Sequence, residues 1–363
     1  MTNEDVLQAL STVQEPDLGK DIVTLNMVQD IVIEGNYVSF TVVLTTPACP
    51  LKDMIKSACI SSIRRINREA VVNVKFTSNT TTKRSDTGVV LPNVKNIIAV
   101  VSGKGGVGKS TVAANLALAI AQGGAKVGLM DADIYGPSIP IMFGVRGERP
   151  LMIEIDGKGM IAPLERYGIK LISIGLLVDE KSAVVWRGPM ASSAIRQFVT
   201  DVYWGELDYL IIDMPPGTGD IHLTLVQTVP VTGAVIVTTP QDVALADAKK
   251  GIAMFGQTQI NVPIIGLIEN MSYFTPAELP GNKYYIFGKE GGKRLAEEYD
   301  LPFLGQIPLV QGIREGGDEG VPAMLSDDEI SKQAFCGVAA HVVRSISMRN
   351  ANMEPAKVAS VVS

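Results

Sequence analysis

The sequence predicts an α/β protein whose main domain is built on a mostly parallel β-sheet and is preceded by a small α+β domain. From Asn96 onward, short apolar runs alternate with longer helical stretches, as in sheets covered by helices on both faces. The first 77 residues instead combine helical stretches with a strand of alternating apolar and polar residues. A polar, threonine-rich segment separates the two patterns, so a chain of 363 residues is expected to form two domains.

The small domain is predicted over residues 1–77, in the order helix, strands, helix and strand. The alternation in YVSFTVVLTT indicates a half-buried strand, and a helical stretch follows Pro50. Residues 78–95 offer little apolar surface to bury and are interpreted as a linker.

The main domain is predicted over residues 96–347. NIIAVVS indicates a buried strand, GKGGVGKS a turn, TVAANLALAIAQ a helix and KVGLMDAD the next strand, which together form a βαβ unit. Further strands are predicted at YLIIDM, GAVIVTT, PIIGLIEN and FLGQIPL, and LMIEIDGKGMIAPL resembles a hairpin inserted among them. A final helix from Asp328 to Ser347 is expected to precede a mobile tail, residues 348–363.

Composition narrows the classes of protein that fit this chain. No apolar run approaches the roughly 18 residues that span a bilayer, and the acidic N-terminus does not have the pattern of a signal peptide. Three cysteines are too few for a disulfide framework, so a cytoplasmic protein is expected. The net charge of −6 makes nucleic acid and anionic membranes unexpected partners.

The turn after the first strand of the main domain carries a phosphate-binding motif. Gly103, Gly108, Lys109 and Ser110 have the spacing G-x-x-x-x-G-K-[ST] between a predicted strand and a predicted helix. In this motif the backbone N–H groups face phosphate oxygens, the lysine contacts the β- and γ-phosphates, and the hydroxyl binds Mg²⁺. The sequence therefore predicts a P-loop NTPase domain that binds ATP and Mg²⁺. The expected nucleotide-binding loop consists of Gly103, Lys104, Gly105, Gly106, Val107, Gly108, Lys109, Ser110 and Thr111.

A second lysine, Lys104, lies inside this loop. The form GKGGVGKST resembles the deviant Walker A group, which includes MinD, ParA and the nitrogenase iron protein. The resemblance implies a homodimer in which Lys104 reaches the nucleotide held by the partner subunit, so that Lys104 joins Lys109 among the catalytic residues. The alternative is that Lys104 is a solvated loop lysine.

Aspartates follow two further strands of the main domain. Asp131 and Asp133 come just past one strand, at the edge where an open α/β sheet binds ligands. By resemblance to the group, Asp133 is expected to position or activate the attacking water, and Asp131 to support the Mg²⁺ shell. Asp213 ends another strand and is the Walker B candidate for the Mg²⁺ shell, followed by a glycine-rich candidate switch, residues 217–220.

Asn270 follows the strand PIIGLIE. In the resembling families the matching asparagine contacts the base, and a side-chain amide can both donate and accept hydrogen bonds. The alternative is an ordinary residue of a turn at the end of a strand.

Several segments together resemble the Mrp/ApbC family, ATP-dependent carriers of iron–sulfur clusters. They are DADIYGPSIPIMFG, WRGPM, DMPPGTGD, IENMSYF, IFGKEGG and REGGDEG, and in the first domain EPDLGKDIV and TTPACPLK resemble a domain of cluster-assembly proteins. The resemblance implies an ATPase that acts as a nucleotide-gated homodimer, with iron–sulfur scaffold or recipient apo-proteins as partners. Many Mrp proteins carry C-x-x-C shortly after the NMSYF-like segment, but here residues 275–288 contain no cysteine. Whether this chain holds a cluster is left open.

The three cysteines differ in their surroundings. Cys59 shares a helical stripe with Ile55, Ile63 and Ile66 and is interpreted as a core residue, and Cys336 in the final helix is expected to be structural too. Cys49 stands just before Pro50, a favoured first residue of a helix. The field of that helix is expected to lower its pKa, which makes Cys49 the candidate cluster ligand.

Two other functions remain open. One is a nucleotide-dependent scaffold without a cluster of its own, and the other is a positioning ATPase like MinD or ParA, which binds membrane or DNA as a dimer. The tail MRNANMEPAKVASVVS has few cations for a membrane-binding helix, and the acidic balance fits poorly with DNA binding. His222 and His341 lack the spacing of a zinc site and are expected to be structural or exposed.

Overall fold

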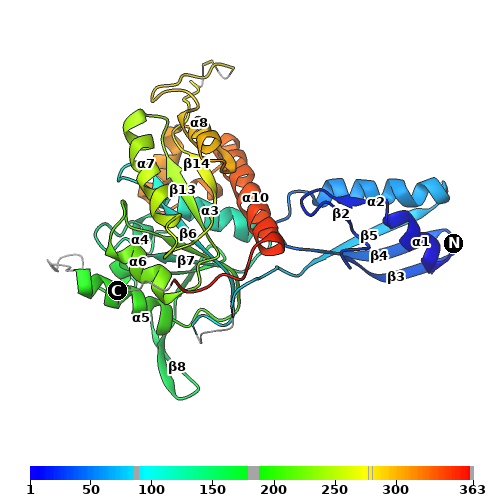
Figure 1. Ribbon diagram of the computed structural model, residues 1–363, viewed down its shortest axis with the longest axis horizontal. Coiled ribbons are helices and arrows are strands. Elements are labelled where there is room, and N and C mark those ends of the chain that lie inside the picture. Colours follow the sequence, from blue (N-terminus) through cyan, green and yellow to red (C-terminus); the bar gives the residue numbers. More distant parts are fainter. Residues whose placement is uncertain (86–89, 179–187, 277, 280, 360–363) are drawn as a thin grey trace. The chain divides into compact units, whose positions relative to one another are not determined.

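A computed structural model of the chain describes residues 1–85, 90–178, 188–276, 278–279 and 281–359 (Figure 1). The chain forms two compact units. The first comprises Met1–Thr81 and Ser347–Met353, and the second Thr82–Ile346 and Glu354–Ser363. The predicted fold class is confirmed, whereas the domain limits drawn from the sequence remain predictions. The chain passes from one unit to the other three times, because the end of its last long helix belongs with the small unit.

The first unit is a small sheet with a helix packed on it. Its elements are α1 (Asn3–Leu10), β1 (Gln14–Glu15), β2 (Lys20–Asp21), β3 (Val28–Glu34), β4 (Tyr37–Leu44), α2 (Lys52–Ile66) and β5 (Val71–Ser78). Strand β4 pairs antiparallel with β3 and parallel with β5. As the alternation in the sequence predicts, Val38, Phe40 and Val42 of β4 are buried in one cluster, which Cys59 of α2 joins.

The second unit contains an eight-stranded sheet in the order β10-β11-β7-β12-β6-β13-β14-β15, in which only β10 is antiparallel to its neighbour. Its strands are β6 (Val94–Val101), β7 (Val127–Asp131), β10 (Leu164–Arg166), β11 (Ile169–Ser173), β12 (Leu207–Asp213), β13 (Gly233–Thr238), β14 (Ile264–Glu269) and β15 (Phe303–Gln306). Its helices are α3 (Lys109–Gln122), α4 (Ile139–Met142), α5 (Gly188–Thr200), α6 (Asp220–Thr228), α7 (Asp242–Phe255), α8 (Gly291–Glu298), α9 (Gln311–Glu319) and α10 (Glu329–Asn352).

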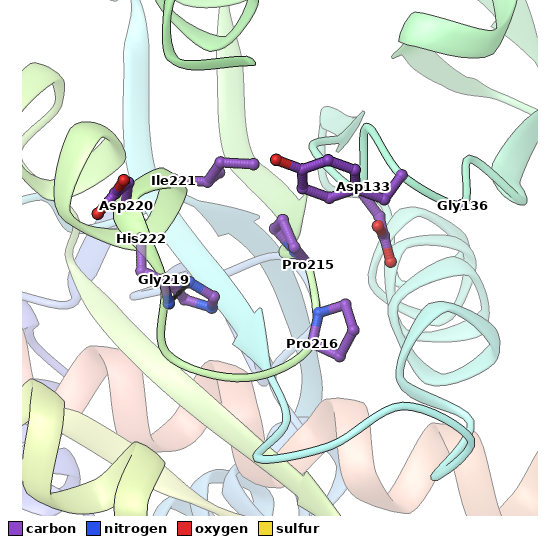
Figure 2. Close-up of a pocket in the computed structure, with 9 residues that line it drawn as sticks. Asp133, Gly136, Pro215, Pro216, Gly219, Asp220, Ile221 and His222 are labelled. Carbon is purple, nitrogen blue, oxygen red and sulfur yellow. Dashed lines mark hydrogen bonds between the residues drawn. The ribbon is translucent and has the colours of Figure 1, made fainter. Parts of the chain in front are cut away.

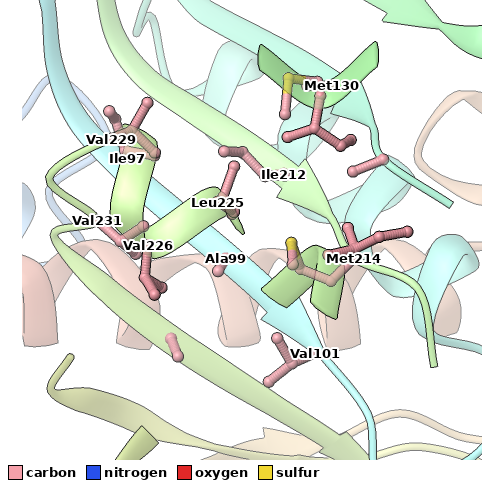
Figure 3. Close-up of a cluster of buried hydrophobic side chains, with 14 of the residues drawn as sticks. Ile97, Ala99, Val101, Met130, Ile212, Met214, Leu225, Val226, Val229 and Val231 are labelled. Atoms are coloured by element: carbon pink, nitrogen blue, oxygen red, sulfur yellow. The ribbon is translucent and has the colours of Figure 1, made fainter. Parts of the chain in front are cut away.

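The main core lies between the sheet and helices that include α5 and α6. Figure 3 shows Ile97, Ala99 and Val101, alternate residues of β6, in one cluster with Leu225 and Val226 of α6. These side chains are almost completely buried. Helix α6 is therefore fixed to the centre of the sheet, and the loop that precedes it lies at the carboxyl edge of the strands.

Every strand predicted for the main domain is found, and the predicted hairpin is β8 (Met152–Ile155) paired antiparallel with β9 (Lys158–Ile161). Asp156 and Gly157 connect its strands with positive φ angles of 51° and 78°, as a two-residue hairpin turn requires. The sequence did not reveal β10 and β11, which are short and interrupted by a glycine turn. Helix α10 runs past its predicted end at Ser347 into the predicted tail.

The chain after α10 returns to the second unit. The backbone N–H of Ala356 donates to the Lys83 carbonyl at 2.7 Å, and that of Ala359 donates to the Val226 carbonyl, at the end of α6, at 2.8 Å. Part of the predicted mobile tail is thus ordered against the linker and the sheet-covering helix.

Candidate nucleotide site

The phosphate-binding loop connects β6 to α3, and two of its glycines are needed for different reasons. At Gly103 an added Cβ would lie 2.1 Å from the carbonyl group of Asp247, so a side chain would collide with the backbone of α7. Gly108 has a φ of +80°, and its absent side chain leaves room for the Asn270 amide. The loop conformation that places N–H groups around a phosphate therefore depends on glycine at both ends.

Lys109, the first residue of α3, is 6% exposed and points toward carboxylates. Its Nζ lies 2.5 Å from Oδ1 of Asp213, 3.2 Å from Oγ of Ser110 and 3.8 Å from Oδ2 of Asp133. The structure thus brings together four residues that the sequence predicts for the site, although they come from three separate segments of the chain.

The register of the sheet explains why the acidic residues meet. Asp213 at the end of β12 stands opposite Asp131 at the end of β7, and Asp131 stands opposite Ser173 at the end of β11. Parallel strands present their carboxyl ends at one edge, where ligands bind. Three neighbouring strands therefore end in polar side chains at the level of the phosphate loop.

Asp213 is fully buried, and only one of its carboxylate oxygens is bonded within the described residues. Oδ1 accepts from Lys109, whereas Oδ2 has no hydrogen-bond partner there. Burial raises the pKa of Asp213, and the Lys109 charge opposes that shift. The Ser110 hydroxyl lowers the pKa of the same carboxyl group, so Asp213 and Ser110 together offer oxygen atoms of the kind that Mg²⁺ takes.

Asp131 is also fully buried, but both of its oxygens have protein donors. Oδ1 accepts from the Asp133 N–H at 3.1 Å, and Oδ2 accepts from Ser173 Oγ at 2.9 Å and the Ile139 N–H at 3.3 Å. Burial and the neighbouring Asp213 charge raise the pKa of Asp131 to about 8. These bonds hold the loop that carries Asp133. Ser173, which completes this arrangement, was missed because its strand was not recognised in the sequence.

Asp133 stands at the wall of a cavity of about 390 Å³ (Figure 2). One wall comes from the loop after β7 and the other from the segment between β12 and α6. The lining residues are Asp133, Tyr135, Gly136, Pro215, Pro216, Gly219, Asp220, Ile221 and His222. The cavity therefore lies between the predicted water-positioning aspartate and the predicted switch, residues 217–220.

A second cavity, of about 330 Å³, is lined by Gly108, Thr111, Asn270 and residues of α4 and α9. The Asn270 amide donates to the Val107 carbonyl at 2.8 Å and so supports the phosphate loop directly. Contact of Asn270 with a base remains a prediction. The α9 residues, Ile313 and Gly317 among them, were not proposed for the site, although they lie in the quoted segment REGGDEG or just before it.

Comparison with known proteins follows the same division of the chain. The family described as NUBPL iron-transfer P-loop NTPase matches residues 93–343. The chain belongs to this NUBPL family. The family described as iron-sulfur cluster assembly protein matches residues 3–76, and the resemblance to Mrp-type proteins predicted from the sequence is confirmed.

Relatives of this NUBPL family member match over nearly their whole length. A Synechocystis protein named iron-sulfur cluster carrier protein is 49% identical over 355 residues, covering 96% of this chain and 99% of its own. A protein of the same name from Escherichia coli K12 is 46% identical over 325 residues, covering 89% and 86%. The structure of a nucleotide-binding protein from Archaeoglobus fulgidus in complex with ADP superposes with a TM-score of 0.55 at 41% identity, covering 63% of this chain and 88% of that one.

Three further expectations for this NUBPL-family chain concern Lys104, the segment WRGPM and membrane-spanning helices. Lys104 is half-buried in the loop, and its carbonyl accepts from Ser102 Oγ at 2.9 Å, so its reach to a partner subunit remains a prediction. In the quoted segment WRGPM, Trp186 and Arg187 lie outside the described residues. Among the described residues, no helix is both long and apolar enough to cross a membrane.

The prediction of a lowered pKa at Cys49 is wrong. Helix α2 begins at Lys52 with Leu51 as its N-cap, so Cys49 lies outside the helix. The thiol is half-buried, and burial raises its pKa, with the charges of Glu15 and Asp17 adding to the effect. The thiolate that binds metal is thus disfavoured at Cys49 in this structure.

The other two cysteines differ in burial. Cys59 is fully buried, as predicted, and burial raises its pKa to about 12, although Ile66 of the proposed stripe is half exposed. Cys336 is exposed, so its predicted structural role is wrong: it lies on the side of α10 that faces away from the core. In the part of the chain that the structure describes, no three His, Cys, Asp or Glu residues are grouped to hold a metal ion.

His341 is exposed, and its Nδ1 lies 2.8 Å from the Leu304 carbonyl. His222, in contrast, is 1% exposed and lines the 390 Å³ cavity beside the switch. The sequence predicted only a structural or exposed role for it. Its position two residues after the segment DMPPGTGD is the signal that could have placed it at the site.

Proposed function

We propose that this chain binds and hydrolyses ATP at the phosphate loop and uses the nucleotide cycle, as a homodimer, to carry iron–sulfur clusters to recipient apo-proteins. The observation that carries the proposal is the cluster around Lys109, in which one ammonium group faces Asp213 and Asp133 at the end of a glycine-rich loop. Membership in the iron-transfer family and the names of the relatives support the proposal that the cargo is an iron–sulfur cluster.

Each residue of the site takes a role that its surroundings support. Lys109 exchanges its carboxylate partners for the β- and γ-phosphates, and Ser110 with the unpartnered oxygen of Asp213 holds Mg²⁺. The metal supplies positive charge that stabilises the transferring phosphoryl group. Asp133, held in place by the bond from its N–H to Asp131, orients the attacking water.

Dimerisation couples the two nucleotide sites through Lys104, which lies in the loop but whose side chain forms no hydrogen bond or ion pair with Ser110, Asp133 or Asp213, the three residues clustered around Lys109. The test is light scattering of wild type and Lys104→Ala with ADP and with ATP. We expect the wild type to dimerise with ATP, and Lys104→Ala to bind ATP with similar affinity yet remain monomeric. Normal ATP-dependent dimerisation of the variant would contradict this role.

One observation favours a second candidate, a nucleotide-dependent scaffold without a cluster of its own. The segment in which many Mrp proteins carry C-x-x-C has no cysteine, and the thiol of Cys49 has a raised pKa. A homodimer would supply only two Cys49 thiolates, fewer than the four ligands that iron–sulfur clusters take. Cluster carriage through Cys49 would therefore need ligands beyond the two Cys49 thiolates.

Anaerobic reconstitution separates the two candidates. Iron and sulfide per protomer are measured in wild type, Cys49→Ser and Cys59→Ser, with ATP turnover measured on the same samples. Carriage through Cys49 predicts iron in the wild type, loss of iron in Cys49→Ser, and iron retained in the matched control Cys59→Ser. Equal iron in wild type and Cys49→Ser excludes this ligand. Negligible iron in all three, with turnover intact, favours the scaffold. We further propose that the protein acts in the cytoplasm, which its few cysteines support.

A further inference from the structure

His222 is the third residue of α6, and among the described residues only one of its two ring nitrogens has a hydrogen-bond partner. Nδ1 accepts a hydrogen bond from the Gly219 N–H at 3.3 Å, whereas Nε2 is buried and has no partner among the described residues. A neutral imidazole that accepts at Nδ1 carries its proton on Nε2. The ring therefore holds a buried N–H donor without an acceptor.

The surroundings keep this ring neutral. Burial lowers the pKa of His222 to about 4, and the charge of Lys109 lowers it further, while the backbone of Gly219 and Pro215 acts in the opposite direction. Pro215 lines the same cavity as His222, and its backbone raises the pKa of the ring in the manner of a hydrogen-bond partner, although among the described residues Nε2 has no acceptor within hydrogen-bonding geometry. Both ends of the segment 215–219 stand next to one imidazole.

This segment joins the strand that ends in Asp213 to helix α6. Together with His222 it forms one wall of the 390 Å³ cavity, and Asp133 and Tyr135 line the same cavity (Figure 2). Helix α6 is fixed to the sheet by its buried apolar residues, so the imidazole has a rigid base. A shift of residues 215–219 would therefore change both their contact with the His222 ring and the shape of the cavity that Asp133 lines.

We propose that His222 is a positioning residue for ATP hydrolysis, whose imidazole fastens both ends of residues 215–219 when the triphosphate is bound, Nδ1 at the Gly219 N–H and Nε2–H at the Pro215 carbonyl. The inference rests on the proposed ATPase function. A buried donor without an acceptor is unfavourable, so it favours the arrangement of the segment that supplies one. The Pro215 backbone can only accept, because proline has no N–H.

A purely packing role is the competing explanation, because the ring also contacts Phe255 edge-on, with 6.5 Å between ring centroids. Two variants separate the roles. His222→Phe retains an aromatic ring against Phe255 and removes both nitrogens. His222→Asn retains a side-chain oxygen that can accept from Gly219, and is too short to reach Pro215.

The proposal predicts a loss of kcat of about 100-fold in His222→Phe, the cost typical of a misplaced catalytic group. The KM for ATP and the affinity for ADP should stay within about twofold, because the phosphate loop is untouched. His222→Asn should lose less. In hydrogen exchange, the amides of residues 217–219 should be better protected with a non-hydrolysable ATP analogue than with ADP in the wild type, and equally protected in His222→Phe.

Wild-type kcat together with wild-type nucleotide-dependent protection in His222→Phe would overturn the proposal. Thermal unfolding with and without ADP shows whether each variant folds. If His222→Phe does not fold, wild-type kcat and wild-type nucleotide-dependent protection in His222→Asn would overturn the proposal instead. If the wild type itself hydrolyses no ATP, the proposed function fails, but the exchange measurement still decides whether His222 fastens the segment.

Discussion

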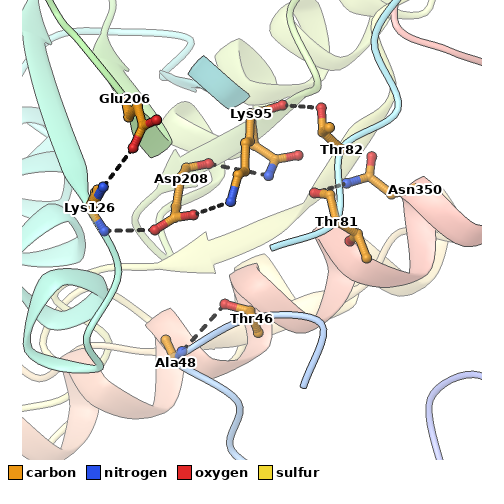
Figure 4. A network of polar contacts seen from close by, with 10 residues as sticks. Thr46, Ala48, Thr81, Thr82, Lys95, Lys126, Glu206, Asp208 and Asn350 are labelled. Atoms are coloured by element: carbon orange, nitrogen blue, oxygen red, sulfur yellow. Dashed lines mark hydrogen bonds and ion pairs between the residues drawn. The ribbon is translucent and has the colours of Figure 1, made fainter. Parts of the chain in front are cut away.

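The two ends of strand β12 differ in how far their charged side chains are exposed to solvent. Where the strand begins, Lys95 lies 3.0 Å from Asp208, and Lys126 lies 2.8 Å from Glu206, with both side chains of the second pair largely exposed (Figure 4). Where it ends, Asp213 is buried beside Asp131 and Asp133, and within the described part of the chain one ammonium group, that of Lys109, faces these carboxyl groups.

The difference separates structural charges from functional ones within a single strand. Ion pairs at the surface are hydrated, screened by salt and close to neutral for stability. Buried carboxylates without enough positive charge are unfavourable, and they remain in a protein when a ligand or cation completes them. The raised pKa values of Asp131 and Asp213 at the carboxyl end of β12 are therefore a property of the ligand site, where a divalent cation would favour the ionised carboxylates.

The largest expected effect comes from removing the Lys109 ammonium group, which pairs with both Asp213 and Asp133. Lys109→Ala should weaken ATP·Mg²⁺ binding by about 100-fold or more, because charge-assisted bonds to the phosphates are lost in a buried site. Isothermal titration calorimetry measures the affinity, with Lys126→Ala as a control from the other end of the same sheet. Unchanged affinity in Lys109→Ala would show that the phosphates bind elsewhere.

Asp133 should affect turnover more than binding, since it lies 3.8 Å from Lys109 and lines the cavity next to the loop. In Asp133→Ala we expect ATP to bind and phosphate release to slow by about 100-fold, the lower range for loss of a positioned base. A persistent ATP-bound dimer should accumulate in light scattering. Phosphate release at the wild-type rate would remove Asp133 from the catalytic residues.

The pH dependence of stability tests the buried charge directly. The pKa of Asp131 is raised to about 8 in the folded protein, from 3.8, so the folded state binds more protons than the unfolded state between these values. The free energy of unfolding of the ligand-free protein should therefore fall as pH rises from about 4 to about 8, with Asp213 acting in the same direction. Denaturant unfolding of Asp131→Asn should show a shallower fall.

A matched control for this measurement is Glu206→Gln at the other end of β12. Lys126 holds the pKa of Glu206 below its usual range, so this carboxyl group can affect the slope only at the acidic end of the interval. The control should keep the wild-type slope. An equally steep slope in Asp131→Asn would mean that other groups dominate the titration.

The smallest effect is expected at the pair formed by Lys95 and Asp208. Lys95→Ala should change the free energy of unfolding by about 1 kcal/mol or less, because the partly exposed ammonium group is hydrated in both states. ADP affinity should not change. Urea unfolding and calorimetry on one sample test both statements, and a large loss of nucleotide affinity would mean that the two ends of the strand are not independent.

Local sequence patterns were sufficient where the chemistry is local. The phosphate loop and its flanking strand and helix are contiguous, and the buried strands are long apolar runs, so both were predicted. Strand β11 was missed because its five residues carry too little periodicity, and the bond from Ser173 to Asp131 was missed with it. The pKa of Cys49 was misjudged because the start of a helix and the burial of a thiol depend on packing, which spacing from Pro50 does not reveal.

The path of the chain has a consequence for dissecting the protein into fragments. Residues 347–353 belong to the small unit, where Asn350 donates to the Thr81 carbonyl at 3.0 Å and the hydroxyls of Thr45 and Ser347 are 3.4 Å apart. A protease that cuts once in the linker therefore releases an N-terminal piece that lacks the last turns of its own unit. The two pieces are expected to complement each other and to co-elute in gel filtration, and a recombinant small domain would need the sequence of residues 347–353 appended to it.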